Sequence, residues 1–240
     1  MTTTTLGLLH AAAWAPGMEN RDWLTWVQAS PHERIQIPIG AADAPALEFL
    51  PALQRRRLSR PARLALQVAH DCMAGERADH IVWSSRHGDS GKTLDILHDL
   101  AKDEPLSPTA FSTSVHNAPA GLYSILFSSD IPSSSLSAGT ESLSQACWEA
   151  AALLGSGQAE RVLVVCYDEP ARKPYSRYVE ESEGVFALGL LFGRTGNSQV
   201  RLSRRRTHAD FSEPETTAFW RFWLQHEPTF VHGHHVWERV

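Results

Sequence analysis

The fold is decided by residues 117–142, which read NAPAGLYSILFSSDIPSSSLSAGTES. Asn117 is a good helix N-cap, Pro119 suits a first helical turn, and the apolar residues that follow have the spacing of one buried helix face. A polar strand is predicted over residues 133–138, and an Ala-rich helix over residues 141–154 comes soon after it. The stretch therefore predicts a helix, a strand, a sharp turn and a second helix.

The sequence on both sides of this stretch predicts strands that alternate with helices. Strands are predicted over residues 6–14, 81–83 and 162–167, helices over residues 62–73 and 94–100, a pair of neighbouring strands over residues 184–192 and 200–203, and an aromatic helix over residues 219–225. This alternation indicates an α/β layered sheet with helices on both faces. The chain contains no internal repeat and no long linker, so residues 1–240 are expected to form one domain.

Composition and charge narrow the function classes. The 42% of hydrophobic residues is ample for a packed core, and the net charge of -5 provides no basic field to hold nucleic acid or an anionic membrane. No window approaches the ~20 apolar residues of a membrane helix, and the first residues lack the basic leader of a signal peptide. The three cysteines lie in apolar stretches without metal-ligand spacing. We expect a cytoplasmic protein with reduced thiols and with no metal or other cofactor.

Residues 88–93 (GDSGKT) imitate a phosphate-binding loop, because they end in Gly-Lys-Thr between a predicted strand and a predicted helix. The full motif requires a further glycine five residues before Gly91, and Arg86 occupies that position. Without that glycine the loop cannot wrap around phosphates with its amides pointing inward. We therefore favour a polar loop that opens a helix, and a nucleotide-binding protein is kept as an alternative function.

The block from Asn117 to Ala151 resembles the β-ketoacyl synthase family of the thiolase fold. In that family an Asn-x-x-Ala-Gly helix is followed by a Gly-Pro-Ser strand and then by a sharp turn that carries a nucleophilic cysteine at the start of a buried helix. Both segments fit here without an insertion, and a looser similarity covers most of residues 60–195. The resemblance implies a thiolase-like layered fold, here a single N-terminal half with a mixed sheet flanked by helices.

The resemblance places Thr140 at the position of the nucleophilic cysteine. A threonine hydroxyl stays protonated without a strong base, and the neighbouring Glu141 disfavours a thiolate nearby. The chain also ends about where the second half of a condensing enzyme, with its two histidines, would begin. His232, His234 and His235 match neither family histidine in context, and we expect them in a flexible solvated tail rather than a metal site. No catalytic residue is expected.

A half-length chain without the cysteine resembles a chain length factor, and it is most similar to the half-length factors of bacterial aryl-polyene clusters. The resemblance implies a subunit that is not an enzyme on its own. It would pair with a catalytic ketosynthase, as a heterodimer or a dimer of heterodimers, and receive the growing chain on an acyl carrier protein. The pair would elongate polyene, polyketide or fatty-acid-like chains. A homodimeric thiolase-like acyl-binding protein is the alternative.

The resemblance also implies which residues would carry this role. In the family, the strand before the nucleophile turn pairs with its counterpart across the dimer, and an unpaired sheet edge is usually covered. The heterodimer-interface candidates are Asn117, Pro132, Ser133, Ser135 and Ser137, the acyl-tunnel candidates are Phe111, His116 and Tyr123, and the carrier-protein docking candidates are Arg55, Arg56, Arg57 and Arg60. Burial in the core is the alternative for the two aromatic residues, and a solvated face is the alternative for the arginines.

Overall fold

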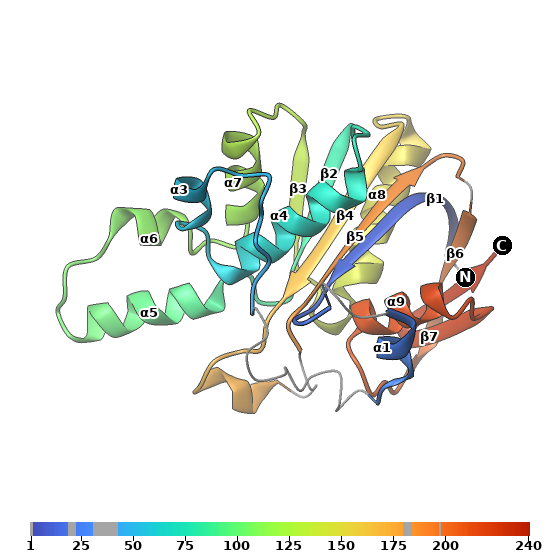
Figure 1. Cartoon of the computed structure of the whole chain (residues 1–240). Coiled ribbons are helices and arrows are strands. Elements are labelled where there is room, and N and C mark those ends of the chain that lie inside the picture. Colours follow the sequence, from blue (N-terminus) through green and yellow to red (C-terminus); the bar gives the residue numbers. More distant parts are fainter. Residues whose placement is uncertain (1, 19–22, 31–42, 180–183, 197) are drawn as a thin grey trace.

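A seven-stranded mixed sheet organises the chain, with the strand order β3-β2-β4-β5-β1-β6-β7 (Figure 1). The computed structural model describes residues 2–18, 23–30, 43–179, 184–196 and 198–240. The strands are β1 (Thr3–Trp14), β2 (His80–Ser84), β3 (Ser133–Leu136), β4 (Arg161–Asp168), β5 (Phe186–Gly193), β6 (Ser198–Ala209) and β7 (Thr229–Arg239). β2 runs parallel to β3 and β4, and the other neighbouring strands are antiparallel.

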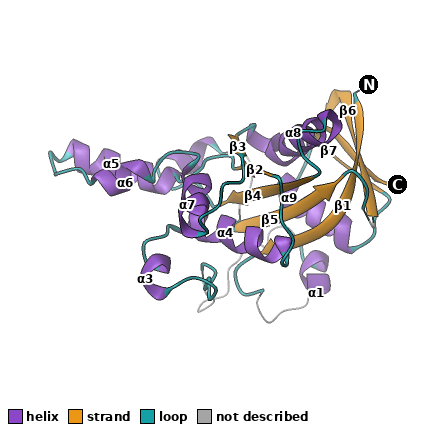
Figure 2. Ribbon diagram, turned by 90° about the horizontal axis from the view of Figure 1, so that it is seen from above, coloured by secondary structure: helices purple, strands orange, loops and turns teal. Residues whose placement is uncertain are grey.

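Helices cover both faces of the sheet, which confirms the predicted α/β layers (Figures 1 and 2). The described helices are α1 (Trp23–Gln28), α3 (Ala52–Arg55), α4 (Arg60–Met73), α5 (Ser90–Ala101), α6 (Pro108–Ser112), α7 (Ala118–Leu126), α8 (Ser142–Ser156) and α9 (Glu215–Leu224), with 3-10 turns η1 (Gly139–Glu141) and η2 (Tyr175–Tyr178). α4 packs on one face beside α7, and α8 and α9 pack on the other. None of the helices within the described ranges is long and apolar enough to cross a membrane.

Strand β4 lies between these two helical layers, which explains its unbroken apolar sequence. Its side chains alternate between two hydrophobic clusters, with Val164 and Cys166 on the α8 side and Val165 and Tyr167 on the α4 side. On the α4 side the layers come very close at Gly189 of β5. A Cβ on this glycine would lie 2.7 Å from the Val68 carbonyl oxygen of α4. Because Gly189 has no side chain, α4 can pack closely against the sheet.

Two predictions about the C-terminal part are wrong. The strands predicted over residues 184–192 and 200–203 do not pair, because β1 lies between β5 and β6 and pairs with both. The C-terminal histidines do not lie in a flexible solvated tail, because this segment is strand β7. His232 and His235 are only 1% and 0% exposed. The sheet extends two strands beyond β1, and aromatic residues of α9 and β7 fill the space beneath it.

One part of the structure projects from this body. Residues 88–116, here called the arm, contain α5 and α6, which lie side by side and away from the sheet (Figures 1 and 2). Helix α5 was predicted over residues 94–100 and begins earlier, at Ser90. The arm leaves the body directly after β2 and returns to it at the start of α7.

Candidate functional site

The predicted nucleophile turn is present between β3 and α8. Thr140 lies in the 3-10 turn η1, after Gly139, whose φ of 58° suits glycine. The Ser142 hydroxyl closes the turn, because it donates to the Gly139 carbonyl (2.7 Å) and accepts from the Ala138 amide (3.0 Å). Thr140 borders a small pocket of about 50 Å³, well below the ~300 Å³ of small-molecule sites.

A buried carboxylate occupies the start of α8. Glu215, from the first turn of α9, accepts hydrogen bonds from both the amide (3.0 Å) and the hydroxyl of Ser144. Burial raises the pKa of Glu215 to about 7, although the Ser144 hydrogen bonds act in the opposite direction. A helix N-terminus normally helps to stabilise a thiolate. Here the Glu215 side chain already accepts a hydrogen bond from one amide in the first turn of α8, that of Ser144.

A second carboxylate, Glu141, follows Thr140 directly and is held by strand β7. It accepts hydrogen bonds from the His234 amide (2.6 Å) and the His234 ring (3.2 Å), and the His235 ring lies 3.4 Å away. Partial burial alone would raise the pKa of Glu141, but the His234 amide and the two histidines outweigh it and lower that pKa. The turn around Thr140 is therefore flanked by acidic groups on two sides.

None of the three cysteines lies in the Thr140 turn. Cys72, Cys147 and Cys166 are all free and buried. Burial raises the pKa of Cys147 and Cys166 well above the usual thiol value. Because the thiolate is the nucleophilic form, burial disfavours nucleophilic chemistry at these two thiols. Cys147 is fully buried in α8.

Strand β3 forms one edge of the sheet, and its outer side has no partner within the described chain. The Ile81 amide donates to the Pro132 carbonyl (3.0 Å), and the Ser85 amide donates to the Leu136 carbonyl (3.3 Å). Backbone groups alternate in direction along a strand, so those of Ser133 and Ser135 point to the open edge. The edge that the resemblance implied is thus present.

The remaining interface candidates lie at the ends of this region. Ser137 follows β3 and its hydroxyl donates to the Arg86 carbonyl (3.0 Å). Asn117 is exposed and precedes α7 as predicted, but its side chain does not cap the helix by a hydrogen bond. A role of these residues in pairing stays a prediction.

The three acyl-tunnel candidates lie in different environments. Phe111 is 66% exposed on the arm, so it is not a core residue. His116 is partly buried, and its Nε2 lies 2.8 Å from the Ser85 carbonyl oxygen. Tyr123 is packed in the core, with its ring centroid 5.5 Å from Trp83. A tunnel role stays a prediction, and Phe111 is the member whose side chain is available to a partner.

The four carrier-protein docking candidates lie in different environments. Arg60 is ion-paired with the buried Glu169, and Arg55 donates to the Ala46 carbonyl (3.0 Å). Arg56 and Arg57 are exposed. Any carrier-protein docking by this cluster therefore depends mainly on Arg56 and Arg57, and it stays a prediction.

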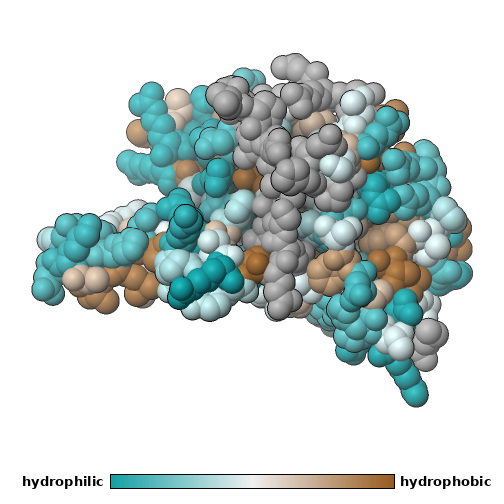
Figure 3. All heavy atoms as spheres, turned by 90° about the horizontal axis from the view of Figure 1, so that it is seen from below, coloured by the Kyte–Doolittle hydropathy of each residue, from teal (hydrophilic) through white to brown (hydrophobic). Residues whose placement is uncertain are grey.

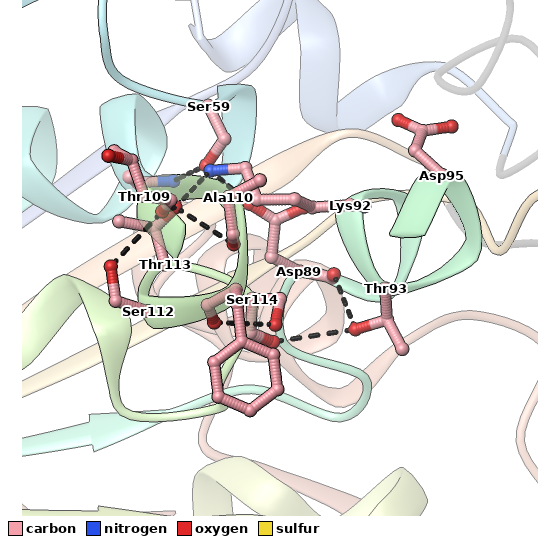
Figure 4. Close-up of polar contacts among 12 residues, drawn as sticks. Ser59, Asp89, Lys92, Thr93, Asp95, Thr109, Ala110, Ser112, Thr113 and Ser114 are labelled. Atoms are coloured by element: carbon pink, nitrogen blue, oxygen red, sulfur yellow. Dashed lines mark hydrogen bonds and ion pairs between the residues drawn. The ribbon is translucent and has the colours of Figure 1, made fainter. Parts of the chain in front are cut away.

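The Gly-Lys-Thr loop is the base of the arm. The Asp89 side chain caps α5 by accepting from the Lys92 amide (3.1 Å), and Lys92 Nζ donates to the Thr113 hydroxyl (2.9 Å), as Figure 4 shows. A phosphate would require these amides and this ammonium group, and side chains of the protein already engage them. This geometry supports the interpretation of residues 88–93 as a polar turn that opens a helix.

Sequence reasoning missed Glu215 altogether. Its partner Ser144 is 71 positions away, so no local pattern connects the two residues. The structure shows no group of three or more His, Cys, Asp or Glu side chains placed to hold a metal ion among the residues that it describes.

Comparison with known proteins identifies the family. A family model described as the N-terminal domain of β-ketoacyl synthase matches residues 23–238. A solved ketosynthase in complex with its chain length factor, from Xenorhabdus doucetiae, contains a chain that matches with 29% identity and a TM-score of 0.83. That match covers 98% of this chain and 99% of the other. No curated protein matched by sequence.

Two more distant structures show the fold alone. The ishigamide ketosynthase/chain length factor matches with 16% identity and a TM-score of 0.59, over 80% of this chain and 63% of the other. A β-ketoacyl synthase from Burkholderia phymatum matches with 14% identity and a TM-score of 0.56, over 80% and 59%. The strand–turn–helix around Thr140, the layered sheet and the match over residues 23–238 lead to one conclusion. The chain belongs to the β-ketoacyl synthase N-terminal domain family.

Proposed function

We propose that this chain is a non-catalytic chain length factor subunit. It pairs with a catalytic β-ketoacyl synthase, and it shapes the acyl tunnel of the pair during polyene, polyketide or fatty-acid-like elongation on an acyl carrier protein. The observation that carries the proposal is Thr140, which lies in the turn where the resemblance places the family's cysteine.

The surroundings of Thr140 support a non-catalytic role. A hydroxyl nucleophile needs an adjacent base, and the groups that flank this turn are the carboxylates of Glu141 and Glu215. Glu141 is already engaged by His234, and Glu215 is engaged by Ser144. The pocket beside Thr140 is about 50 Å³, so an elongated acyl chain would need space supplied by a second protein.

The open edge of β3 supports the proposed pairing. The unpaired amides and carbonyls of an edge strand can form hydrogen bonds with a strand of another chain, and proteins usually cover such an edge. The matched chain of the Xenorhabdus doucetiae structure belongs to a ketosynthase–chain length factor complex, and the match extends over nearly all of both chains. We infer that the catalytic partner supplies the strand that covers β3, together with the nucleophile.

Ser135→Pro tests this proposal at the open edge. Proline removes an amide that points outward, so it should block a partner strand while the β2–β3 ladder stays intact. Binding to a ketosynthase encoded nearby is measured by calorimetry. We expect Ser135→Pro to weaken binding by about tenfold or more, since that loss corresponds to ~1.4 kcal/mol. Ser135→Ala keeps the amide and should bind like the wild type.

Two further measurements complete the test. The isolated Ser135→Pro chain should keep its melting temperature, because the change leaves the internal hydrogen bonds of the sheet in place. Intact-protein mass spectrometry with acyl carrier substrates should show no acyl adduct on the isolated chain. An adduct on Thr140 or Cys147, or a wild-type chain that binds no ketosynthase, would contradict the proposed function.

A further inference from the structure

We propose that the arm, residues 88–116, is a docking arm whose exposed apolar face is buried by the catalytic ketosynthase subunit. This inference rests on the proposed function and adds a second contact region to the β3 edge. It also gives a role to the Gly-Lys-Thr loop, which the proposed function leaves unexplained.

The arm exposes more apolar surface than a solvated hairpin needs. Five large side chains on it are between 43% and 66% exposed, namely Leu97, Leu100, Leu106, Phe111 and Val115. Hydrophobic atoms gather along one side of the arm in the space-filling view (Figure 3). On α5 they continue a helical stripe that begins at the buried Leu94, with the spacing i, i+3 and i+6. Such a face on a projecting element marks an interaction site.

The base of the arm holds it away from the body. Lys92 Nζ donates to the Thr113 hydroxyl (2.9 Å), and the Thr93 hydroxyl donates to the Ser114 carbonyl (3.4 Å), so these two contacts join α5 to the segment after α6 (Figure 4). Gly91 lies so close to Arg172 that a Cβ would be 2.9 Å from the guanidinium carbon. The polar contacts are thus concentrated at the base, where Phe111 and Val115 also lie, while Leu97, Leu100 and Leu106 lie further along the arm.

The position of the arm identifies the surface that it would share. The arm, α7 and the edge strand β3 lie on the same side of the molecule (Figure 1). α7 packs against β3, and its Ile125 is 75% exposed. A protein that pairs with β3 would therefore meet α7 and then the arm. A four-residue strand alone covers a small part of the ~800 Å² per partner in a stable interface, and the arm supplies further apolar area.

The charge of the arm selects between the two protein partners of the proposed function. Residues 88–116 contain five carboxylates, Asp89, Asp95, Asp99, Asp103 and Glu104, and only two lysines, Lys92 and Lys102. Acyl carrier proteins are acidic, so like charges would oppose their docking on this arm. The ketosynthase subunit is the occupant that both the location and the charge favour.

The test uses the double variant Leu97→Glu/Leu100→Glu in the full chain. Both side chains are exposed, so the isolated variant should fold and keep the melting temperature of the wild type. Its affinity for the same ketosynthase should fall by about tenfold or more, because two charges would be buried at an apolar contact. Leu53→Glu is the matched control, since Leu53 is 67% exposed on α3, outside the arm. It should bind like the wild type.

The outcomes separate this inference from the proposed function. If Ser135→Pro loses binding while the arm variant binds normally, the arm inference is overturned and the proposed function stands. If the wild-type chain binds no ketosynthase, both fail. Weaker binding to the acyl carrier protein with unchanged ketosynthase binding would make the arm a carrier site. Loss of self-association in sedimentation with unchanged ketosynthase binding would make it a contact between copies, and each of these results overturns the inference. Leu100→Ser, which adds no charge, repeats the test if the double variant does not fold.

Discussion

Gly233→Ala probes the contact that holds the Thr140 turn against strand β7. Gly233 adopts a φ of 53°, in the left-handed region, and a Cβ there would overlap the Oε1 atom of Glu141. That oxygen accepts the hydrogen bond from the His234 amide at 2.6 Å. The substitution should therefore push the Glu141 carboxylate out of its site and break this hydrogen bond.

The expected loss has two parts. An alanine in the left-handed region costs about 1–2 kcal/mol. Losing a hydrogen bond to a charged group costs about 1.5–3 kcal/mol more. The free energy of unfolding should therefore fall by about 2.5–5 kcal/mol, a large part of the stability of a domain. Chemical denaturation followed by circular dichroism measures it.

Gly75→Ala is the matched control for the backbone part. Gly75 also has a positive φ, 89°, and no atom lies within 4 Å of the position of its Cβ. It should lose only about 1–2 kcal/mol. In a Glu141→Ala background the overlap is gone, so Gly233→Ala should cost no more than Gly75→Ala does. Equal losses for Gly233→Ala and Gly75→Ala in the wild-type background would refute the overlap argument.

Two other predictions concern the buried carboxylate and the arm. The pKa of Glu215, raised by burial from about 4.5 to about 7, means that the folded chain keeps a proton that the unfolded chain has lost. Stability should therefore fall as pH rises through that window, by up to ~3 kcal/mol, and Glu215→Gln should remove this part of the slope. Equal pH slopes in denaturation would contradict it. Phe111→Ala should lengthen the products of the assembled pair, measured by liquid chromatography. It should leave the melting temperature of the isolated chain unchanged, because the ring is 66% exposed and not in a core where its loss costs ~3–5 kcal/mol. An unchanged product length would exclude Phe111 from the tunnel.

Elements with strong local patterns were predictable from the sequence. Helix α4 has Ser59 as its N-cap, a proline in the first turn and one apolar face, and β4 is an unbroken apolar run. The order of the strands was not predictable in the same way. β1 separates β5 from β6, and its register with them joins residues almost 200 positions apart, such as Gly7 with Gly193. No local pattern records a pairing over that distance, so two strands close in sequence suggested a hairpin.

The candidate site also has parts that consecutive residues predict and parts that depend on contacts between distant residues. The turn around Thr140 was found through the family resemblance, which rests on a strand, a turn and a helix that are consecutive in sequence. Glu215 was not found, because its partner Ser144 is distant in sequence. The arm was not found, because what distinguishes it is an apolar face that the rest of the described chain leaves exposed. The exposed fraction of Leu97 or Phe111 is a property of the folded chain, and a helical apolar pattern is the same whether its face is covered or open.

In strand β7 a single residue, Gly233, changes which of the histidine side chains are buried. Side chains of a regular strand alternate, so His232 and His234 would share one face and His235 the other. The structure instead buries both His232 and His235, because the pairing with β6 changes register between Arg204 and Ala209, opposite Gly233. The left-handed Gly233 reverses the alternation, as a bulge does. It turns His235 inward and leaves the His234 amide facing Glu141. A glycine inside a strand pattern is a known sign of a bulge, so this residue was the available signal, and it links the histidine-rich strand to the turn of Thr140.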